Sequence, residues 1–290
     1  LSGIAVGLSM AVGGFGYWAL VGMAIAQPAG FMLALWVASG WMPGLPRRGT
    51  GAVAMLRYGG LLTLNGAVIY VAYNVDKVLL GRFYGAETLG LYGRAYQLIS
   101  IPNDNLQAAM GSVMFPALAR VQHDPQRLRG YFLKGYGAFL FIVMPTTIAC
   151  GLFAADIVRV LLGPQWSAAV PIFQLLAPTI LVFAILNPMY HLMVATGRPG
   201  LSLKIAFLIT PTVILGYTLG LPYGPRGVAL GFSVAMLLLV WPSASWAIRG
   251  TQITATDLLR VTLHPLISSC VGAAVAFGIW MAMGGANVLL

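Results

Sequence analysis

Charge is scarce in this chain. Charged residues occupy 8% of its 290 positions, and Asp and Glu together number six. A soluble domain is roughly half apolar and carries charge at about a quarter of its positions, whereas this chain is 59% hydrophobic with a mean hydropathy of +0.88. The composition excludes an ordinary soluble domain and indicates an integral membrane protein.

Cysteine and histidine are also rare, which argues against disulfide, metal and catalytic chemistry. Cys150 and Cys270 both fall in apolar runs without metal-ligand spacing, so we expect small core thiols. His123, His191 and His264 form no cluster, and no catalytic dyad, phosphate-cradling glycine loop or zinc motif is present. We therefore expect no enzyme, cofactor or metal. His191, inside a proline-rich span, has two interpretations, a proton relay or a hydrogen-bonded packing residue.

Apolar runs of helical length divide the chain into membrane spans. About 20 residues of α-helix cross roughly 30 Å of hydrocarbon, and the runs lack the ten-residue alternation of a transmembrane barrel. Because a helical bundle satisfies every backbone group internally, the expected fold class is an all-α integral membrane protein, a polytopic helical bundle. We expect a partial span at 1–14 and full spans near 17–42, 52–80, 88–118, 131–154, 168–196, 201–221, 226–248 and 261–284.

The net charge of +10 would suggest nucleic acid in a soluble protein, but here the basic residues concentrate in alternate loops. Cytoplasmic loops of membrane proteins carry an excess of Lys and Arg. We therefore predict that the loops near 43–51, 120–130, 197–204 and 249–260 are cytoplasmic, and we expect no nucleic-acid partner. Eleven basic residues flank these loops: Arg47, Arg48, Arg57, Arg120, Arg127, Arg129, Lys134, Arg198, Lys204, Arg249 and Arg260. Only Arg82, Arg159 and Arg226 fall on the other side.

Ionisable residues within a predicted hairpin are the strongest functional signal. An ionised side chain near the bilayer centre costs on the order of 3 kcal/mol, so it is usually paired, hydrated or functional. Asp76 and Arg94 lie nine residues before and after Gly85, the centre of a predicted turn, which places both roughly 13 Å below the helix ends. We predict that they pair across the hairpin. Lys77, about 100° from Asp76 around the helix, would then point to an interior cavity or a second partner.

Polar stripes on the hairpin helices predict what surrounds these charges. Residues that repeat at three and four positions share one helix face. Two polar faces at one depth suggest a hydrated cavity, and the alternative is that they only join helices by hydrogen bonds. One stripe comprises Arg94, Gln97, Ile101, Asp104 or Asn105, and Ala108; the other comprises Asn65, Ala72 and Asp76, with Tyr58 and Ile69 beside them.

Several motifs follow one another in a specific order. They are Asn74–Arg82, Leu89–Tyr92, Arg94–Leu98, Phe115–Arg120, Asp124-Pro125 with Arg127–Arg129, Leu161–Gly163 with Trp166, and Ala195–Pro199. In this order the chain resembles polysaccharide flippases of the multidrug/oligosaccharidyl-lipid/polysaccharide exporter superfamily, in particular the O-antigen and colanic-acid exporters. The resemblance covers nearly the whole chain.

The resemblance implies a domain organisation. Residues 1–46 would be the last two helices of an N-terminal lobe, residues 51–250 the C-terminal six-helix lobe, and residues 251–290 an additional helix. The chain opens at Leu1 within an apolar run, without the basic segment of a signal peptide. We therefore expect a fragment of a longer transporter that lacks the first four helices of the family.

The resemblance also implies a function, which is export of a polyprenyl-pyrophosphate-linked oligosaccharide across the bacterial inner membrane by alternating access. Arg94 and Lys77 would bind the anionic group, because an Arg fork matches phosphate oxygens and Lys supplies a compact charge. Asp76 would hold Arg94 in the empty site. Sugar hydroxyls would be bound by Gln97, Asn65, Asp104 and Asn105. The expected partners are the lipid-linked substrate, membrane lipids and, as candidates, glycosyltransferases or a polymerase of the same pathway.

Two other functions stay open. A multidrug cation antiporter of the same superfamily would have this architecture but more acidic cavity residues, whereas this hairpin has two bases against one central acid. A non-transporting, truncated membrane remnant would also explain the incomplete first lobe.

Overall fold

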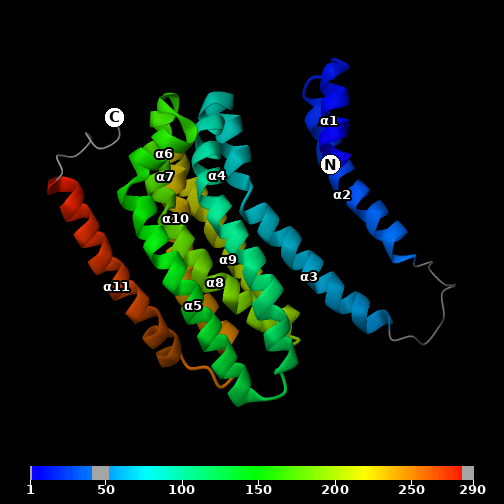
Figure 1. Ribbon diagram of the computed structural model, residues 1–290, viewed down its shortest axis with the longest axis vertical. Helices are drawn as coiled ribbons and strands as arrows, with labels where there is room; N and C mark the ends of the chain where they lie inside the picture. The colour runs from blue at the N-terminus through cyan, green and yellow to red at the C-terminus, as the bar shows by residue number, and fades with distance from the viewer. Residues whose placement is uncertain (1, 41–51, 283–290) are drawn as a thin grey trace. The chain divides into compact units, whose positions relative to one another are not determined.

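The computed structural model describes residues 2–40 and 52–282, and every regular element in these ranges is a helix (Figure 1). Six helical stretches in the described ranges are long and apolar enough to cross a membrane. The predicted all-α membrane fold is therefore confirmed. The chain divides into two compact units between Ala52 and Val53.

The first unit is a helical hairpin. It contains α1 (Ser2–Val12) and α2 (Trp18–Ser39), joined by a turn in which Gly14 and Gly16 have φ values of 78° and 54°. A glycine lets these helices approach closely, since a Cβ added to Gly7 would lie 3.0 Å from Cβ of Met23. The predicted loop near 43–51, with Arg47 and Arg48, lies outside the described residues.

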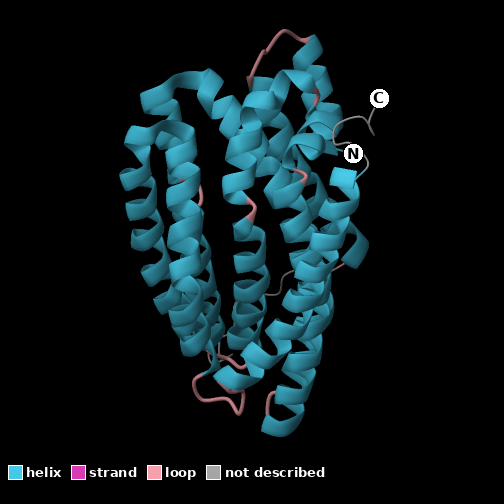
Figure 2. Cartoon of the chain, turned by 90° about the vertical axis from the view of Figure 1, so that its left-hand side faces the viewer, coloured by secondary structure: helices cyan, strands magenta, loops and turns pink. Residues whose placement is uncertain are grey.

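The second unit is a bundle in which helices run side by side and most loops lie at their ends (Figure 2). The packed core is mostly apolar, with buried aromatic side chains such as Phe132, Phe173 and Phe232. The short helices α6 and η1 were not predicted from the apolar runs, and the predicted span 168–196 contains two helices, α7 and α8. The elements are α3 (Ala52–Ala72), α4 (Val75–Arg120), α5 (Pro125–Leu152), α6 (Ala154–Leu162), η1 (Pro164–Ala169), α7 (Val170–Leu176), α8 (Pro178–Ala195), α9 (Pro199–Gly220), η2 (Leu221–Tyr223), α10 (Gly224–Ile248) and α11 (Ala255–Ala282).

The predicted turn around Gly85 is present inside α4. Gly85 has φ 81° and ψ 179°, a backbone conformation that interrupts the helix and favours glycine. The chain runs to this turn and then returns through the second part of α4 (Figure 1). The hydroxyl of Tyr84 donates to the backbone carbonyl of Leu221 at 2.6 Å, which ties the turn to η2.

Loops with basic residues meet at the opposite end of the bundle. The Arg198 guanidinium donates to the backbone carbonyls of Arg249 and Ala247, which joins the loop after α8 to the loop after α10. Arg129 makes a bidentate ion pair with Asp257, with distances of 2.9 and 2.6 Å. These contacts bring three of the predicted cytoplasmic loops together, those near 120–130, 197–204 and 249–260. Their location in the cytoplasm stays a prediction.

One packing prediction is wrong. Cys150 is half-buried, but Cys270 is exposed on α11. The physical reason is that α11 packs along one face against α5, where Tyr136 contacts Thr262 at 3.3 Å, so its other face is uncovered in this unit.

Candidate functional site

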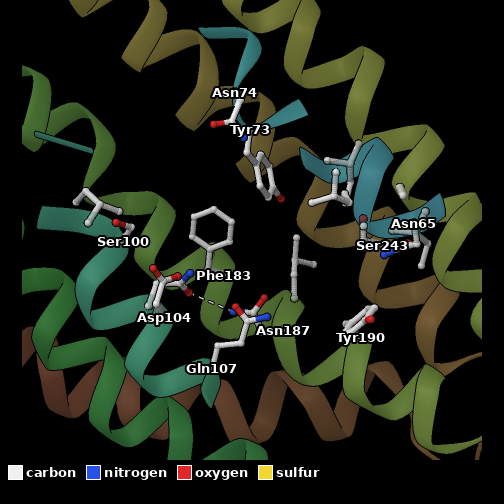
Figure 3. Close-up of a pocket in the computed structure, with 18 of the residues that line it drawn as sticks. Asn65, Tyr73, Asn74, Ser100, Asp104, Gln107, Phe183, Asn187, Tyr190 and Ser243 are labelled. Atoms are coloured by element: carbon white, nitrogen blue, oxygen red, sulfur yellow. Dashed lines mark hydrogen bonds between the residues drawn. The ribbon is translucent and has the colours of Figure 1, made fainter. Parts of the chain in front are cut away.

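A cavity of about 710 Å³ lies within the second unit, in the size range of small-molecule sites. Its wall comes from α3, α4, α8, α9 and α10, and Figure 3 shows side chains from several of these helices around one space. The wall combines polar side chains with aliphatic and aromatic ones. The amides are Asn65, Asn74, Gln97, Asn103, Gln107 and Asn187, and the hydroxyls are Tyr73, Tyr96, Ser100, Tyr190, Ser202 and Ser243.

A break between α3 and α4 places a lysine on this wall. The predicted span 52–80 is interrupted at Tyr73 and Asn74, and both residues line the cavity. The Lys77 ammonium donates to Oδ1 of Asn74 at 2.7 Å and lies 5.1 Å from the centre of the Tyr96 ring. Both partners are neutral, so among the described residues no carboxylate neutralises Lys77 within 4.0 Å. Lys77 thus lies on the wall of a cavity, which is one of the two alternatives that the sequence left open for it.

Asp76 faces the protein interior instead of the cavity. Its side chain is fully buried, and Oδ1 accepts the backbone N–H of Lys77 at 2.8 Å. Its Oδ2 and the buried hydroxyl of Tyr92 interact without a hydrogen bond of normal geometry. Asp76 is not among the residues that line the cavity. The adjacent residues Asp76 and Lys77 thus point to different environments, as their separation of about 100° around the helix requires.

The predicted ion pair between Asp76 and Arg94 is wrong. Arg94 is exposed, donates to Oε1 of Gln97 at 2.9 Å, and lies 5.6 Å from the Trp166 ring of η1. Arg94 does not line the cavity. The guanidinium is thus held by a neutral amide and an aromatic ring, while the carboxylate of Asp76 is enclosed elsewhere.

The reason is the rotation of α4. Residues of α4 that line the cavity repeat with helical spacing, and at about 100° per residue Arg94 lies roughly 120° from the centre of their stripe. Of the predicted stripe, Gln97 and Asp104 line the cavity, whereas Ile101, Asn105 and Ala108 do not. Asn105 instead donates to the backbone carbonyl of Ile101 at 2.8 Å. The α4 stripe is Gly93, Tyr96, Gln97, Ile99, Ser100, Asn103, Asp104 and Gln107.

The remaining predicted residue, Asn65, is on the cavity wall. Its Oδ1 accepts a hydrogen bond from the hydroxyl of Ser202 at 3.0 Å, joining α3 to α9. Among the residues that the sequence prediction named, the structure therefore brings Lys77, Gln97, Asn65 and Asp104 to one cavity. It places Asp76, Arg94 and Asn105 outside it.

Several cavity residues were missed. Asn187 of α8 donates to Oδ1 of Asn103 at 3.1 Å across the cavity wall, shown as the dashed line in Figure 3. Tyr73 packs edge-on against Phe183, with ring centroids 5.6 Å apart. A usable signal was present, because Asn187 is an amide inside the apolar span 168–196 and Tyr73 precedes an amide inside the span 52–80.

The cavity suits a polar ligand that also has apolar faces. Amides and hydroxyls both donate and accept hydrogen bonds, and aromatic faces provide apolar contact. The wall carries one basic and one acidic side chain, Lys77 and Asp104. Within the described ranges, no group of three His, Cys, Asp or Glu residues is placed to bind a metal ion.

Comparison with known proteins finds relatives named for polysaccharide biosynthesis. A model of the family described as "Polysaccharide biosynthesis protein" matches residues 1–171. The lipopolysaccharide biosynthesis protein WzxC of Escherichia coli is 29% identical over 202 residues, which cover 68% of this chain and 40% of that protein. The teichuronic acid biosynthesis protein TuaB of Bacillus subtilis is 29% identical over 62% of this chain and 37% of its own length. The chain thus spans about two fifths of the curated relatives that it matches.

A solved structure has a similar fold. The lipid II flippase MurJ, in an inward closed conformation, aligns with a TM-score of 0.67 at 16% identity. The alignment covers 92% of this chain and 57% of the MurJ chain.

Proposed function

The chain belongs to the polysaccharide biosynthesis protein family, and from this premise we propose that it is part of an exporter for a polyprenyl-pyrophosphate-linked oligosaccharide. The exporter would move this lipid across the bacterial inner membrane by alternating access. The names of its relatives support a substrate of polysaccharide biosynthesis. The fold shared with a lipid II flippase supports a transport mechanism without bond making or breaking.

A two-lobe arrangement follows from this proposal. Residues 1–46 would belong to an N-terminal lobe, residues 51–250 would form the C-terminal lobe, and residues 251–290 would supply an additional helix. The division between Ala52 and Val53 is compatible with this assignment. The loops near 120–130, 197–204 and 249–260 would face the cytoplasm, because basic residues concentrate in them.

The observation that carries the proposal is a polar cavity inside a bundle of membrane-spanning length. Buried polar groups are costly unless they form hydrogen bonds. The many amides and hydroxyls around this cavity therefore require a polar ligand or water inside it. Sugar hydroxyls match these groups because each hydroxyl can donate and accept. The aromatic rings of Tyr73, Phe183 and Tyr190 would contact the apolar faces of sugar rings.

Lys77 is the proposed anchor for the pyrophosphate. Among the described residues its ammonium contacts the neutral side chains of Asn74 and Tyr96 and forms no ion pair within 4.0 Å, so an anionic oxygen would gain a charge-assisted hydrogen bond there. Asn65 and Gln97 would bind sugar hydroxyls. Asp104 would also accept hydrogen bonds from sugar hydroxyls.

The residues outside the cavity take different proposed roles. Arg94 would act indirectly, by holding the side chain of Gln97. Asp76 would fix the start of α4 through the backbone N–H of Lys77. Asn105 is proposed to contribute to helix packing only, because its amide bonds within its own helix.

A complementation experiment tests the proposal. A bacterial strain that lacks its own polysaccharide exporter would carry the gene for this protein with Lys77→Ala. Loss of a charge-assisted hydrogen bond of roughly 1.5–3 kcal/mol lowers substrate affinity by about 10- to 150-fold, so surface polysaccharide should fall and the lipid-linked precursor should accumulate inside. Lys77→Arg should retain part of the export. The matched control is Lys204→Ala, an exposed lysine of α9 outside the cavity.

Normal export by Lys77→Ala at equal membrane abundance would remove Lys77 from the site. If Asn187→Leu and Tyr190→Ala also left export unchanged, the cavity would not be the substrate path. Transport of a cationic drug, abolished by Asp104→Asn, would instead assign the chain to the antiporter class, since Asp104 is the acidic residue on the described wall.

A further inference from the structure

A second cavity lies between the last turns of α4 and the first turns of α5. Its volume is about 570 Å³, and it shares no lining residue with the larger cavity. Arg127 and Lys134 of α5 supply its cations, while Val113 and Ala117 of α4 are among its apolar residues. We name this cavity the α4–α5 groove.

The two cations lie on one face of α5. They are seven residues apart, so they project from nearly the same side, about 10 Å apart along the helix axis. Lys134 is exposed and, within the described ranges, forms no ion pair. Arg127 contacts Asp124 through Nε at 3.3 Å, but the side chains are 74% and 47% exposed, and exposed pairs of this kind bind weakly. Asp124 also caps α5 by accepting the N–H groups of Gln126 and Arg127.

The rest of the groove is shaped for hydrocarbon. Gly130 lies between the two cations, and a Cβ added to it would meet no atom within 4 Å. The side chain of Val113 is 71% exposed along the facing helix. The α4–α5 groove is therefore open and largely apolar, with positive charge along one side. Its helices are long enough to cross a membrane.

We propose that the α4–α5 groove binds an anionic glycerophospholipid. Its phosphate would lie between Arg127 and Lys134, and one acyl chain would lie along Gly130, Val113 and Ala117. Basic pockets between transmembrane helices bind acidic lipid headgroups. The same groove offers cations for the phosphate and apolar surface for the acyl chain. The proposal does not depend on the export function, because the groove is separate from the larger cavity.

Native mass spectrometry of the purified protein tests the proposal. The protein would be titrated with phosphatidylglycerol or with phosphatidylcholine, and bound lipids would be counted. We expect preferential retention of phosphatidylglycerol and at least a tenfold loss of its affinity in Arg127→Gln/Lys134→Gln. The matched control, Lys204→Gln/Arg260→Gln, removes two cations outside the groove and should bind like the unmodified protein.

A second variant separates lipid binding from charge and folding. Gly130→Leu retains both cations and fills open space, so it should also lose phosphatidylglycerol while the protein keeps its thermal stability. Equal binding of the two lipids, or full binding by both variants, would overturn the proposal. Binding of a polyprenyl pyrophosphate that phosphatidylglycerol fails to displace would overturn it as well, because the groove would then select the other lipid.

Discussion

Close contact between α9 and α10 gives a stability prediction whose size follows from the structure. A Cβ added to Gly216 would lie 2.5 Å from the backbone oxygen of Gly231 and 3.1 Å from Cβ of Ala235. Ordinary van der Waals contacts begin at 3.4 Å, so Gly216→Ala requires the helices to separate by roughly 0.9 Å. A gap of this size forfeits about a quarter to a half of each affected dispersion contact.

The expected cost is about 1–3 kcal/mol, the usual range for overpacking. The obstructing atom is backbone and cannot rotate away. Helix propensity has the opposite sign, because alanine is favoured over glycine by about 1 kcal/mol in a helix interior. A net loss of stability would therefore have to come from the contact between the helices.

Gly272→Ala is the matched control. Gly272 lies in α11, and a Cβ there would meet no atom within 4 Å, so this change should be neutral or stabilising. Both variants would be unfolded reversibly in detergent, with helicity as the signal. Equal stability of the two variants would refute the packing argument, and a stabilised Gly216→Ala would show that propensity dominates.

Three further predictions concern charged side chains. Arg94→Ala should reduce export much less than Lys77→Ala at equal abundance, because its guanidinium lies outside the cavity; surface polysaccharide measures both. Asp257→Ala should lower the stability of the protein in detergent by roughly 1–3 kcal/mol, since it removes a bidentate ion pair and an acceptor at the start of α11, and in an Arg129→Ala background the same change should cost less. Asp76→Leu should lower the thermal midpoint more than Asp76→Asn, whose amide oxygen can still accept the backbone N–H that Asp76 accepts.

Sequence reasoning placed the helices because the length of an apolar run is a local property. The runs at 201–221 and 226–248 correspond to α9 and α10, and Gly85 marked the turn because its conformation favours glycine. Short helices at the end of the bundle, such as α6, leave no such signal, because one amphipathic run of nine residues is too short to span a membrane.

The direction of each side chain was harder to predict. Helical periodicity groups residues into faces, but it does not say which face meets the cavity when the opposing helices are unknown. Arg94 and Asp104 share a helix, and the wall formed by α8 and α9 decides that Asp104 lines the cavity while Arg94 contacts Trp166. The missed Asn187 belongs to that wall, so a prediction made from the hairpin alone could not find the site in full.

The break at Tyr73 and Asn74 locates the cavity better than the charges do. Irregular backbone at membrane depth is tolerated only where protein or a water-filled space satisfies its polar groups. Here the Asn74 amide donates to the backbone carbonyl of Tyr70 at 2.8 Å while its oxygen accepts from Lys77. The Asn74 side chain therefore satisfies a backbone carbonyl at the end of α3 and also holds Lys77 on the cavity wall. An asparagine in an apolar run, three residues before a lysine, thus identifies both the interruption and the side of the helix that faces a polar ligand.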